Sequence, residues 1–353
     1  MIPYITLLFF LLAINLLGVD KVTKKYKQLF IISSFLYLWL FSGLRYQVGM
    51  DYIAYEEYYE QSYFSLCKDF KEPGFAYFFY ALKSIGVPFP IITLILSFIT
   101  ILLIYIFILR YSALPFLSIL IFYTFAHYYT YSFNVMRQVL ASYIFLSSIN
   151  LIVQRKLIQY TLTIILTTCF VHTTAIILLP LYFILHRSYS LKFKIFLLAC
   201  SCMASSIFIG IINNIEAYSI YLKFEDYAHG LSMTTMILMV TSIIFLFIEV
   251  YKSNKTALSN VLYNINYLVL VFLSISLCFL NQPLILVFTR FAIYFTPIYI
   301  VLIPNAISIL TKSKNKVALI CIIAIIYSTV FIFQLKTGGE KNKFIPYKTV
   351  ITK

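Results

Sequence analysis

The chain has 353 residues, of which 62% are hydrophobic and only 11% are charged, and its formal net charge is +15. A soluble domain carries about a quarter charged residues, so this composition excludes an ordinary soluble protein. The excess of lysine is confined to short loops between apolar stretches, as is typical of cytoplasmic loops that face anionic lipid, and we expect no nucleic-acid partner. No nucleotide-binding or zinc motif is present, so we expect neither a cofactor nor a metal.

Stretches of about 20 apolar residues recur along the chain, and each is long enough to cross a bilayer core of roughly 30 Å. We therefore predict an all-α, polytopic integral membrane protein that forms a single transmembrane domain over residues 1–353. The charge pattern of the loops predicts about 12 crossings. These are residues 1–19, 28–44, 91–109, 114–131, 134–153, 157–185 (as two half-helices), 195–212, 231–250, 262–280, 284–307 and 317–334.

The first large loop, residues 45–90, is the longest polar interruption of this pattern. The first apolar stretch has no basic residue before it and several lysines after it, which predicts a retained span with its N-terminus outside. The loop then also lies outside, and so does the polar tail, residues 336–353. Residues 74–89 are apolar but short, with Lys83 in their middle, and we predict that they form a re-entrant or interfacial helix.

Residues 157–185 are nearly continuous and apolar, yet basic residues flank them on both sides. One span cannot begin and end on the same side of a membrane. We therefore expect two half-helices that turn near His172, an arrangement tolerated where the broken helices line a cavity.

This topology places nine polar residues in the outer half of the protein: Arg45, Asp51, Glu72, Asn134, Arg137, Gln138, His172, Arg290 and Tyr294. The spacing i, i+3 and i+4 predicts that Asn134, Arg137 and Gln138 share one helix face. Arg290 is expected about two turns below the outer surface, with Tyr294 one turn deeper. A buried arginine with no acid near it in sequence needs an anion.

Three arginines beside carboxylates and a histidine favour glycosyl transfer from a polyprenyl-pyrophosphate donor. The planar guanidinium groups of Arg45, Arg137 and Arg290 would bind the phosphate oxygens. One of Asp51, Glu72 and His172 would take the proton from the attacking sugar hydroxyl, with Asp51 and His172 as the leading candidates. The leaving group is already a stabilised anion, so the arginines could supply the electrostatic part without a metal.

Several short motifs, in order along the chain, resemble those of the EpsG/Wzy-type polysaccharide polymerases. They are Gly43-Leu44-Arg45 with Val48-Gly49-Met50-Asp51-Tyr52 and Tyr55, Glu72-Pro73-Gly74-Phe75, Asn134-Val135-Met136-Arg137-Gln138 with Ala141, Phe170-Val171-His172-Thr173-Thr174-Ala175, Arg290-Phe291-Ala292-Ile293-Tyr294, and Pro346-Tyr347-Lys348. Met50 stands where the family usually has a small residue.

The resemblance implies an enzyme that polymerises undecaprenyl-pyrophosphate-linked oligosaccharide repeat units into O-antigen, capsule or exopolysaccharide. It implies a site at the outer, periplasmic or extracellular, face of the cytoplasmic membrane. Its partners would be the lipid-linked substrate, membrane lipid and, in the cell, a chain-length regulator and a flippase.

Other interpretations of the same residues stay open. A lipid-linked oligosaccharide flippase would use similar arginines, although it should show two comparable halves. An acyltransferase that decorates the glycan would use His172 as its base. Among single residues, Arg45 could reach up to lipid headgroups, Asp51 or Glu72 could cap a helix, and His172 could be a core histidine bonded to Thr168 or Thr173.

Overall fold

A computed structural model describes residues 1–17, 24–69, 71–125, 127–212, 232–251, 256–280, 284–310 and 313–352. Over these ranges the chain is all-helical, with one isolated bridge between Arg45 and Thr349 and no strand. Six helical segments in this part are long and apolar enough to cross a membrane: Phe89–Tyr111, Met136–Val153, Met233–Tyr251, Ala257–Leu277, Ile285–Ile309 and Asn315–Gly338. The polytopic, all-α prediction is confirmed, whereas the structure supports six such spans and not the exact count of twelve.

The chain divides into two compact units. Unit 1 contains Met1–Ser147, Leu162–Ile176 and Tyr299–Lys353, and unit 2 contains Ser148–Thr161 and Ile177–Ile298. Helices α8 (Met136–Val153) and α9 (Leu157–Phe170) and the 3₁₀ helix η2 (Thr173–Leu178) contribute residues to both units.

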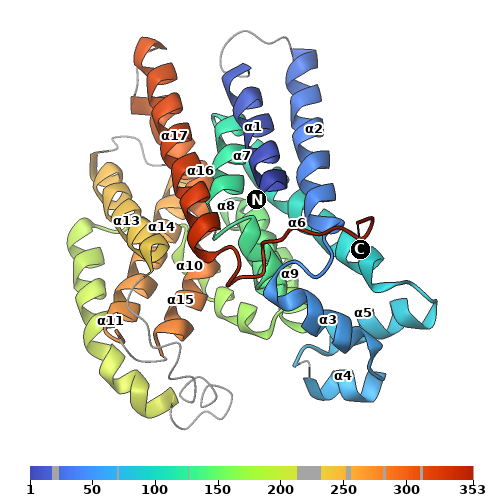
Figure 1. The fold of residues 1–353 in the computed structure, drawn as a ribbon. Helices are drawn as coiled ribbons and strands as arrows, with labels where there is room; N and C mark the ends of the chain where they lie inside the picture. Colours follow the sequence, from blue (N-terminus) through green and yellow to red (C-terminus); the bar gives the residue numbers. More distant parts are fainter. Residues whose placement is uncertain are drawn as a thin grey trace. The chain divides into compact units, whose positions relative to one another are not determined.

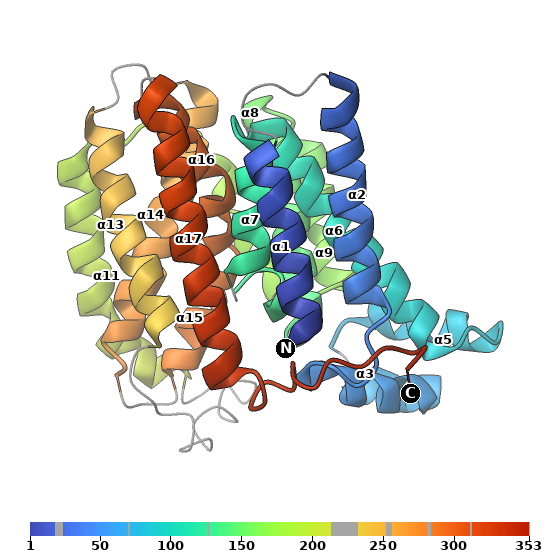
Figure 2. The same ribbon diagram turned by 45° about the horizontal axis from the view of Figure 1, so that its top comes forward.

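Unit 1 is a helical bundle in which α2 packs along α6, while α7 lies against α1, α16 and α17 (Figures 1 and 2). Its other elements are α1 (Ile2–Leu17), α2 (Lys24–Gly43), α3 (Met50–Glu60), α4 (Tyr63–Asp69), α5 (Pro73–Ser84), α6 (Phe89–Tyr111), α7 (Pro115–Thr124), η1 (Thr130–Phe133), α16 (Tyr299–Leu310) and α17 (Ser313–Gly338). The indole of Trp39 in α2 donates to the Leu94 carbonyl of α6.

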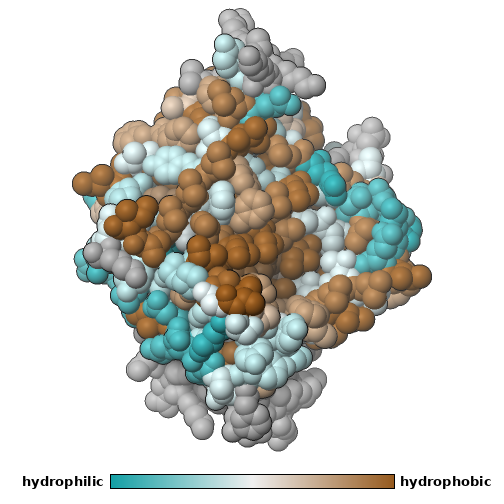
Figure 3. Space-filling view, turned by 90° about the vertical axis from the view of Figure 1, so that its right-hand side faces the viewer, coloured by the Kyte–Doolittle hydropathy of each residue, from teal (hydrophilic) through white to brown (hydrophobic). Residues whose placement is uncertain are grey.

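Apolar side chains cover parts of the surface of unit 1 in helical stripes. On α6 the exposed apolar residues recur about once per helical turn: Ile91, Ile95, Phe98 with Ile99, Leu102, Ile106 and Leu109. On α2 they are Leu29, Ile32, Leu36 and Leu40. Figure 3 shows apolar residues across the middle of one face and hydrophilic residues towards its margins. An apolar stripe that faces outward is what a lipid-facing helix requires.

The first large loop folds into three short helices, α3, α4 and α5, at one end of α1, α2 and α6 (Figure 2). Helix α5 has 12 residues and is therefore about 18 Å long, too short to cross a bilayer. One of its faces, with Phe75 and Phe79, is buried, while Tyr77 and Tyr80 are exposed. A short amphipathic helix of this kind suits the predicted interfacial or re-entrant position.

Two predicted spans are interrupted in the structure. Helix α7 ends at Thr124, and the Tyr-rich residues that were expected to continue it to residue 131 form turns and η1. Helix α9 ends at Phe170 and η2 begins at Thr173, so the apolar stretch breaks at Val171 and His172, the place that the sequence predicts.

Helix α17 continues to Gly338, three residues into the predicted polar tail. Beyond it, residues 339–352 lie across the connection from α2 to α3 (Figure 1). The Tyr46 amide donates to the Lys348 carbonyl, and the Val350 amide donates to the Leu44 carbonyl. The ring of Tyr347 stacks on that of Phe41, with 4.2 Å between the centroids.

Unit 2 is built around α14, which packs against α11, α13 and α15. Its elements are α10 (Leu181–Ile184), α11 (Leu191–Ile212), α13 (Met233–Tyr251), α14 (Ala257–Leu277), α15 (Ile285–Ile293) and η4 (Thr296–Ile298). Thr256 and Ser259 form a capping box that begins α14, which satisfies two of its free amide groups.

Candidate functional site in unit 1

The carboxylate of Glu72 is the centre of a polar cluster that joins three segments far apart in sequence. Glu72 stands just before α5, and its side chain is only 4% exposed. Its Oε2 accepts a hydrogen bond from Nη1 of Arg137 in α8. Its Oε1 accepts from both the amide and the hydroxyl of Thr173, each at 2.7 Å, and lies 3.3 Å from Nδ1 of His172. The cluster lies entirely in unit 1.

Gly74 lets these segments approach one another. A Cβ atom at position 74 would lie 2.4 Å from the ring of Phe170, the last residue of α9. Because glycine has no Cβ, α5 can pack directly against the end of α9. This contact brings Glu72 to the chain break at His172 and Thr173.

Arg137 is held in a fixed position in the first turn of α8. Its Nε donates to the hydroxyl of Tyr55 at 2.7 Å, and its guanidinium carbon lies 5.1 Å from the centroid of the Phe75 ring. A guanidinium over an aromatic ring gains a cation–π attraction that strengthens when water is excluded. Tyr55, Phe75 and Glu72 therefore fix both the place and the orientation of this arginine.

The electrostatics of the cluster keep Glu72 ionised. Burial by itself would raise the pKa of Glu72, but the contact with His172, the charge of Arg137 and the hydrogen bonds from Thr173 together lower that pKa well below its usual range. Arg137 and His172 remain more accessible than the carboxylate: the side chain of His172 is 24% exposed and that of Arg137 is 18% exposed. An incoming molecule can therefore meet the imidazole and the guanidinium, but not the carboxylate.

Asp51 and Asn134 hold the starts of two helices together. The amide of Met50 donates to Asn134 Oδ1 at 2.7 Å, and the amide of Met136 donates to Asp51 Oδ2 at 3.3 Å. Asn134 thus satisfies an amide at the start of α3, and Asp51 satisfies an amide at the start of α8. Because α8 begins only at Met136, Asn134 precedes the helix and does not share a face with Arg137 and Gln138, which corrects that prediction.

Gly49 makes this arrangement possible. Its φ angle is +93°, and a Cβ atom there would lie 2.5 Å from the carbonyl oxygen of Phe133. Only glycine combines that left-handed backbone with so close an approach. The Gly49-Met50-Asp51 motif therefore docks α3 onto the residues just before α8.

Arg45 lies apart from the cluster and is 2% exposed. Its Nη1 donates to the Ser42 carbonyl and to the Ser97 hydroxyl, and its guanidinium carbon lies 4.6 Å from the centroid of the Phe133 ring. Among the residues that the structure describes, no carboxylate lies within ion-pair distance of Arg45. The bridge to Thr349 further covers it with the C-terminal tail.

The remaining predicted site residues have different surroundings. Gln138 is buried in α8. Arg290 is in the last turn of α15 in unit 2 and is exposed rather than buried, which corrects that prediction. Tyr294, directly after α15, is fully buried. Arg290 and Tyr294 belong to unit 2, whereas all members of the Glu72 cluster belong to unit 1.

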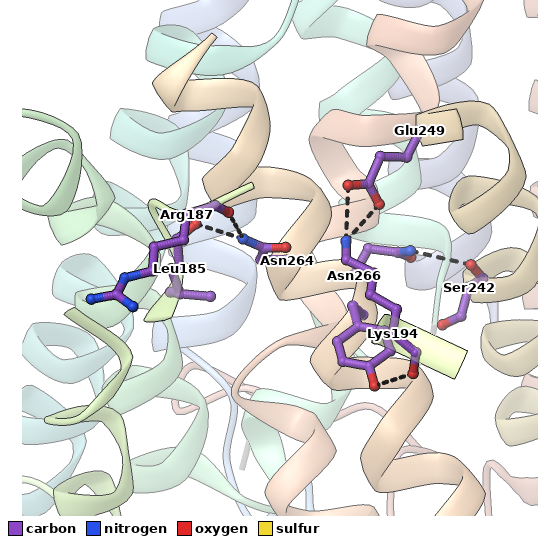
Figure 4. A network of polar contacts seen from close by, with 8 residues as sticks. Leu185, Arg187, Lys194, Ser242, Glu249, Asn264 and Asn266 are labelled. Atoms are coloured by element: carbon purple, nitrogen blue, oxygen red, sulfur yellow. Dashed lines mark hydrogen bonds and ion pairs between the residues drawn. The ribbon is translucent and has the colours of Figure 1, made fainter. Parts of the chain in front are cut away.

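Sequence reasoning missed one residue of the cluster and one whole polar network. Thr173 follows the predicted turn directly, and its place beside His172 in the motif of residues 170–175 was the signal that could have identified it. In unit 2, Nζ of Lys194 lies 2.7 Å and 2.8 Å from the two oxygens of Glu249 (Figure 4). Asn264 and Asn266 bond backbone carbonyls close to this pair. Glu249 and Lys194 both stand near basic loop residues, so they resembled loop charges.

Comparison with known proteins agrees with the motifs. A model of the EpsG family matches residues 28–349, which is nearly the whole chain. No curated protein and no solved structure is significantly similar to the chain. The match includes every residue of the Glu72 cluster.

Proposed function

The chain belongs to the EpsG family, and from this membership we propose that it is a polysaccharide polymerase of the cytoplasmic membrane. Its substrates are undecaprenyl-pyrophosphate-linked oligosaccharide repeat units. It transfers the growing chain from its lipid carrier onto the next unit at the outer face of the membrane. The bond between the anomeric carbon and the pyrophosphate oxygen breaks, a glycosidic bond to the acceptor hydroxyl forms, and undecaprenyl pyrophosphate leaves.

The observation that supports this proposal is the Glu72 cluster itself. One buried carboxylate holds a guanidinium and an imidazole side by side, and both reach the surface of unit 1. Transfer of a glycosyl group from a diphosphate needs one cation for the leaving phosphates and one base for the acceptor hydroxyl. Arg137 and His172 supply these two functions.

His172 is the proposed base. Its Nδ1 faces Glu72 Oε1, so Nε2, on the other side of the ring, is the nitrogen that can accept the proton of the sugar hydroxyl. A carboxylate behind an imidazole holds the ring in one orientation and stabilises the imidazolium that forms. The Nδ1 contact is not an aligned hydrogen bond in this structure, and such bonds often tighten only when substrate binds.

Glu72 is a positioning residue in this mechanism. Its carboxylate already accepts from Arg137 and twice from Thr173, and it is almost completely buried. A carboxylate with these partners is a poor base and a strong anchor. Asp51 and Asn134 act one step further away, because they fix the start of the helix that carries Arg137.

The arginines outside the cluster have different parts in the proposal. Arg290, which is exposed in unit 2, and Tyr294 remain candidate phosphate-binding residues of that unit on the motif to which they belong. Arg45 is buried against Phe133 and the two serines, and we assign it a structural role in joining α2, α6 and the tail. Gln138 is buried beside Arg137, and we assign it to the support of the site.

The test is to delete the gene in its host, restore it as wild type or as His172→Asn, and size the surface glycan on a gel. The proposal expects that the deletion and the variant both leave single repeat units on the lipid carrier, because general-base catalysis contributes about 10² to 10⁴ in rate. His186→Asn is the matched control, since the side chain of His186 contacts a backbone carbonyl in unit 2.

Two outcomes contradict the proposal. Trapping of lipid-linked units on the inner side of the membrane, with no surface glycan, would indicate a flippase. A glycan of unchanged length that lacks a substituent would indicate an acyltransferase.

A further inference from the structure

The end of unit 1 opposite to the Glu72 cluster contains a pocket that is separate from this cluster. Tyr4, near the start of α1, donates to the Phe344 carbonyl of the tail, so this end of α1 lies on the side of the cluster. Asn15, near the other end of α1, lines a pocket of about 210 Å³. Its other lining residues come from three elements: Lys27 of α2, Ala113, Leu114, Pro115, Phe116 and Leu117 at the start of α7, and Lys316 and Ile320 of α17.

The charge of this pocket is positive. Lys27 and Lys316 are about 290 positions apart in sequence, yet both line the same cavity, and none of the described residues that line it is acidic. Like charges that converge without a counter-ion repel one another. An anion between them removes that cost.

Asn15 is the second and independent feature. It is 1% exposed, and its Nδ2 has no hydrogen-bond partner among the described residues. A buried donor without a partner costs about 1–3 kcal/mol, and buried polar groups are almost always paired. An acceptor oxygen in the pocket would satisfy this amide.

The start of α7 adds further donors. No side chain caps this helix. Asn305 of α16 holds the turn before it: the Ala113 amide donates to Asn305 Oδ1, and Asn305 Nδ2 donates to the Tyr111 carbonyl. The first amides of a helix carry a partial positive charge and bind anions. Phe116 and Leu117, whose amides belong to this first turn, both line the pocket.

From these three features we propose that the pocket binds a phosphate group. Two lysines, the Asn15 amide and the α7 N-terminus would hold it, in a basic pocket between membrane helices of the kind that binds phospholipid headgroups. The phosphate can come from an anionic membrane lipid or from a soluble phosphate compound, and both present the same oxygens. This inference does not depend on the proposed polymerase activity.

The test uses the purified full-length protein in neutral-lipid nanodiscs, with two probes: phosphatidylglycerol added to the disc, and inorganic phosphate added to the buffer. Binding is measured by native mass spectrometry and by the thermal unfolding temperature. We expect the double variant Lys27→Gln/Lys316→Gln to bind roughly 25-fold more weakly, because each lysine near an anionic headgroup contributes a factor of about five. The matched control is Lys156→Gln/Lys192→Gln, which removes two exposed lysines outside the pocket.

A second variant guards against a folding defect. Asn15→Asp keeps the size of the side chain and places a negative charge at the lining of the pocket, so it should abolish binding of both probes. Stabilisation by phosphatidylglycerol alone assigns the pocket to a lipid headgroup, and stabilisation by inorganic phosphate alone assigns it to a soluble phosphate. Equal binding by the wild type, both pocket variants and the control overturns the proposal.

Discussion

Two buried ion pairs, one in each unit, differ in what surrounds them. In unit 2 the ammonium of Lys194 meets both oxygens of Glu249, and the side chains are 2% and 9% exposed. The hydroxyl of Tyr267 donates to the Lys194 carbonyl, and its ring lies 5.4 Å from the ammonium. Both charged side chains are therefore almost completely buried.

The Glu72 cluster of unit 1 is built differently. Its carboxylate is as buried as that of Glu249, but it holds groups from two other segments, and both Arg137 and His172 are partly exposed. The cluster also sits where helices break, at the start of α5 and after α9. A buried charge in a membrane protein is therefore not a site by itself; the exposure of its partners distinguishes an anchored reactive group from a structural pair.

The largest effect is expected for Glu72→Gln, which leaves the guanidinium of Arg137 without its counter-charge and His172 without its anchor. Removal of one partner of a buried pair costs about 3–5 kcal/mol. The variant should make no polymer and should unfold at a lower temperature, as measured by glycan gels and by thermal unfolding in detergent. Glu60→Gln is the control, because that side chain is 72% exposed. Normal polymer from the Glu72 variant would refute the role of the cluster.

The pair in unit 2 should affect stability and not activity. Lys194→Met alone leaves Glu249 buried and unpaired, so it should cost about 3–5 kcal/mol, whereas the double variant Lys194→Met/Glu249→Leu should be nearly neutral or more stable. Thermal unfolding and glycan sizing check both effects. The matching double variant at Glu72 and Arg137 should not restore polymer. If the double variant Lys194→Met/Glu249→Leu were stable but made no polymer, the distinction between the two pairs would fail.

A smaller effect is expected for Gly74→Ala. The added methyl group meets the ring of Phe170, and overpacking of this kind costs about 1–3 kcal/mol. The polymer should become shorter, because Glu72 moves away from His172 and Thr173. The second substitution Phe170→Leu should restore part of the length. The polymer length of the single and double variants is measured on a glycan gel. An unchanged polymer length in Gly74→Ala would show that the contact does not position the cluster.

The smallest effect concerns pH. The pKa of Glu72 is lowered in the folded protein, while a glutamate in the unfolded chain titrates near about 4.3. The stabilisation by this carboxylate is therefore complete above that unfolded value and is lost as the pH falls through the folded pKa. The difference in unfolding temperature between the wild type and Glu72→Gln should not narrow from about pH 8 to 5 and should narrow below about pH 4. A difference that closes near pH 6 would contradict the assignment of the ionised state.

The short motifs of the sequence predict much of the candidate site. Glu72, Arg137 and His172 were all named from motifs and from their expected side of the membrane, and the structure brings these three together. From the sequence, Asp51 was favoured over Glu72 as the carboxylate of the site, because Arg45 stands six residues before it. The structure shows Asp51 at the amide of Met136 instead, because a contact between helices decides which carboxylate meets which donor.

Composition, the length of the apolar stretches and the motifs by themselves determine that this is a polytopic, all-α membrane protein of the EpsG family, because a bilayer core of roughly 30 Å imposes its length on any helix that crosses it. The helix break at His172 could also be predicted from the sequence, since basic residues on both sides of residues 157–185 forbid a single crossing. Only the tertiary structure decides that Glu72 lies against Thr173, 101 positions away. It also decides that Lys194 pairs with Glu249 and that Arg290 is exposed. Such contacts depend on how closely helices approach one another, as at Gly74 and Phe170. The local sequence of one helix does not indicate which residue of another helix will lie against it.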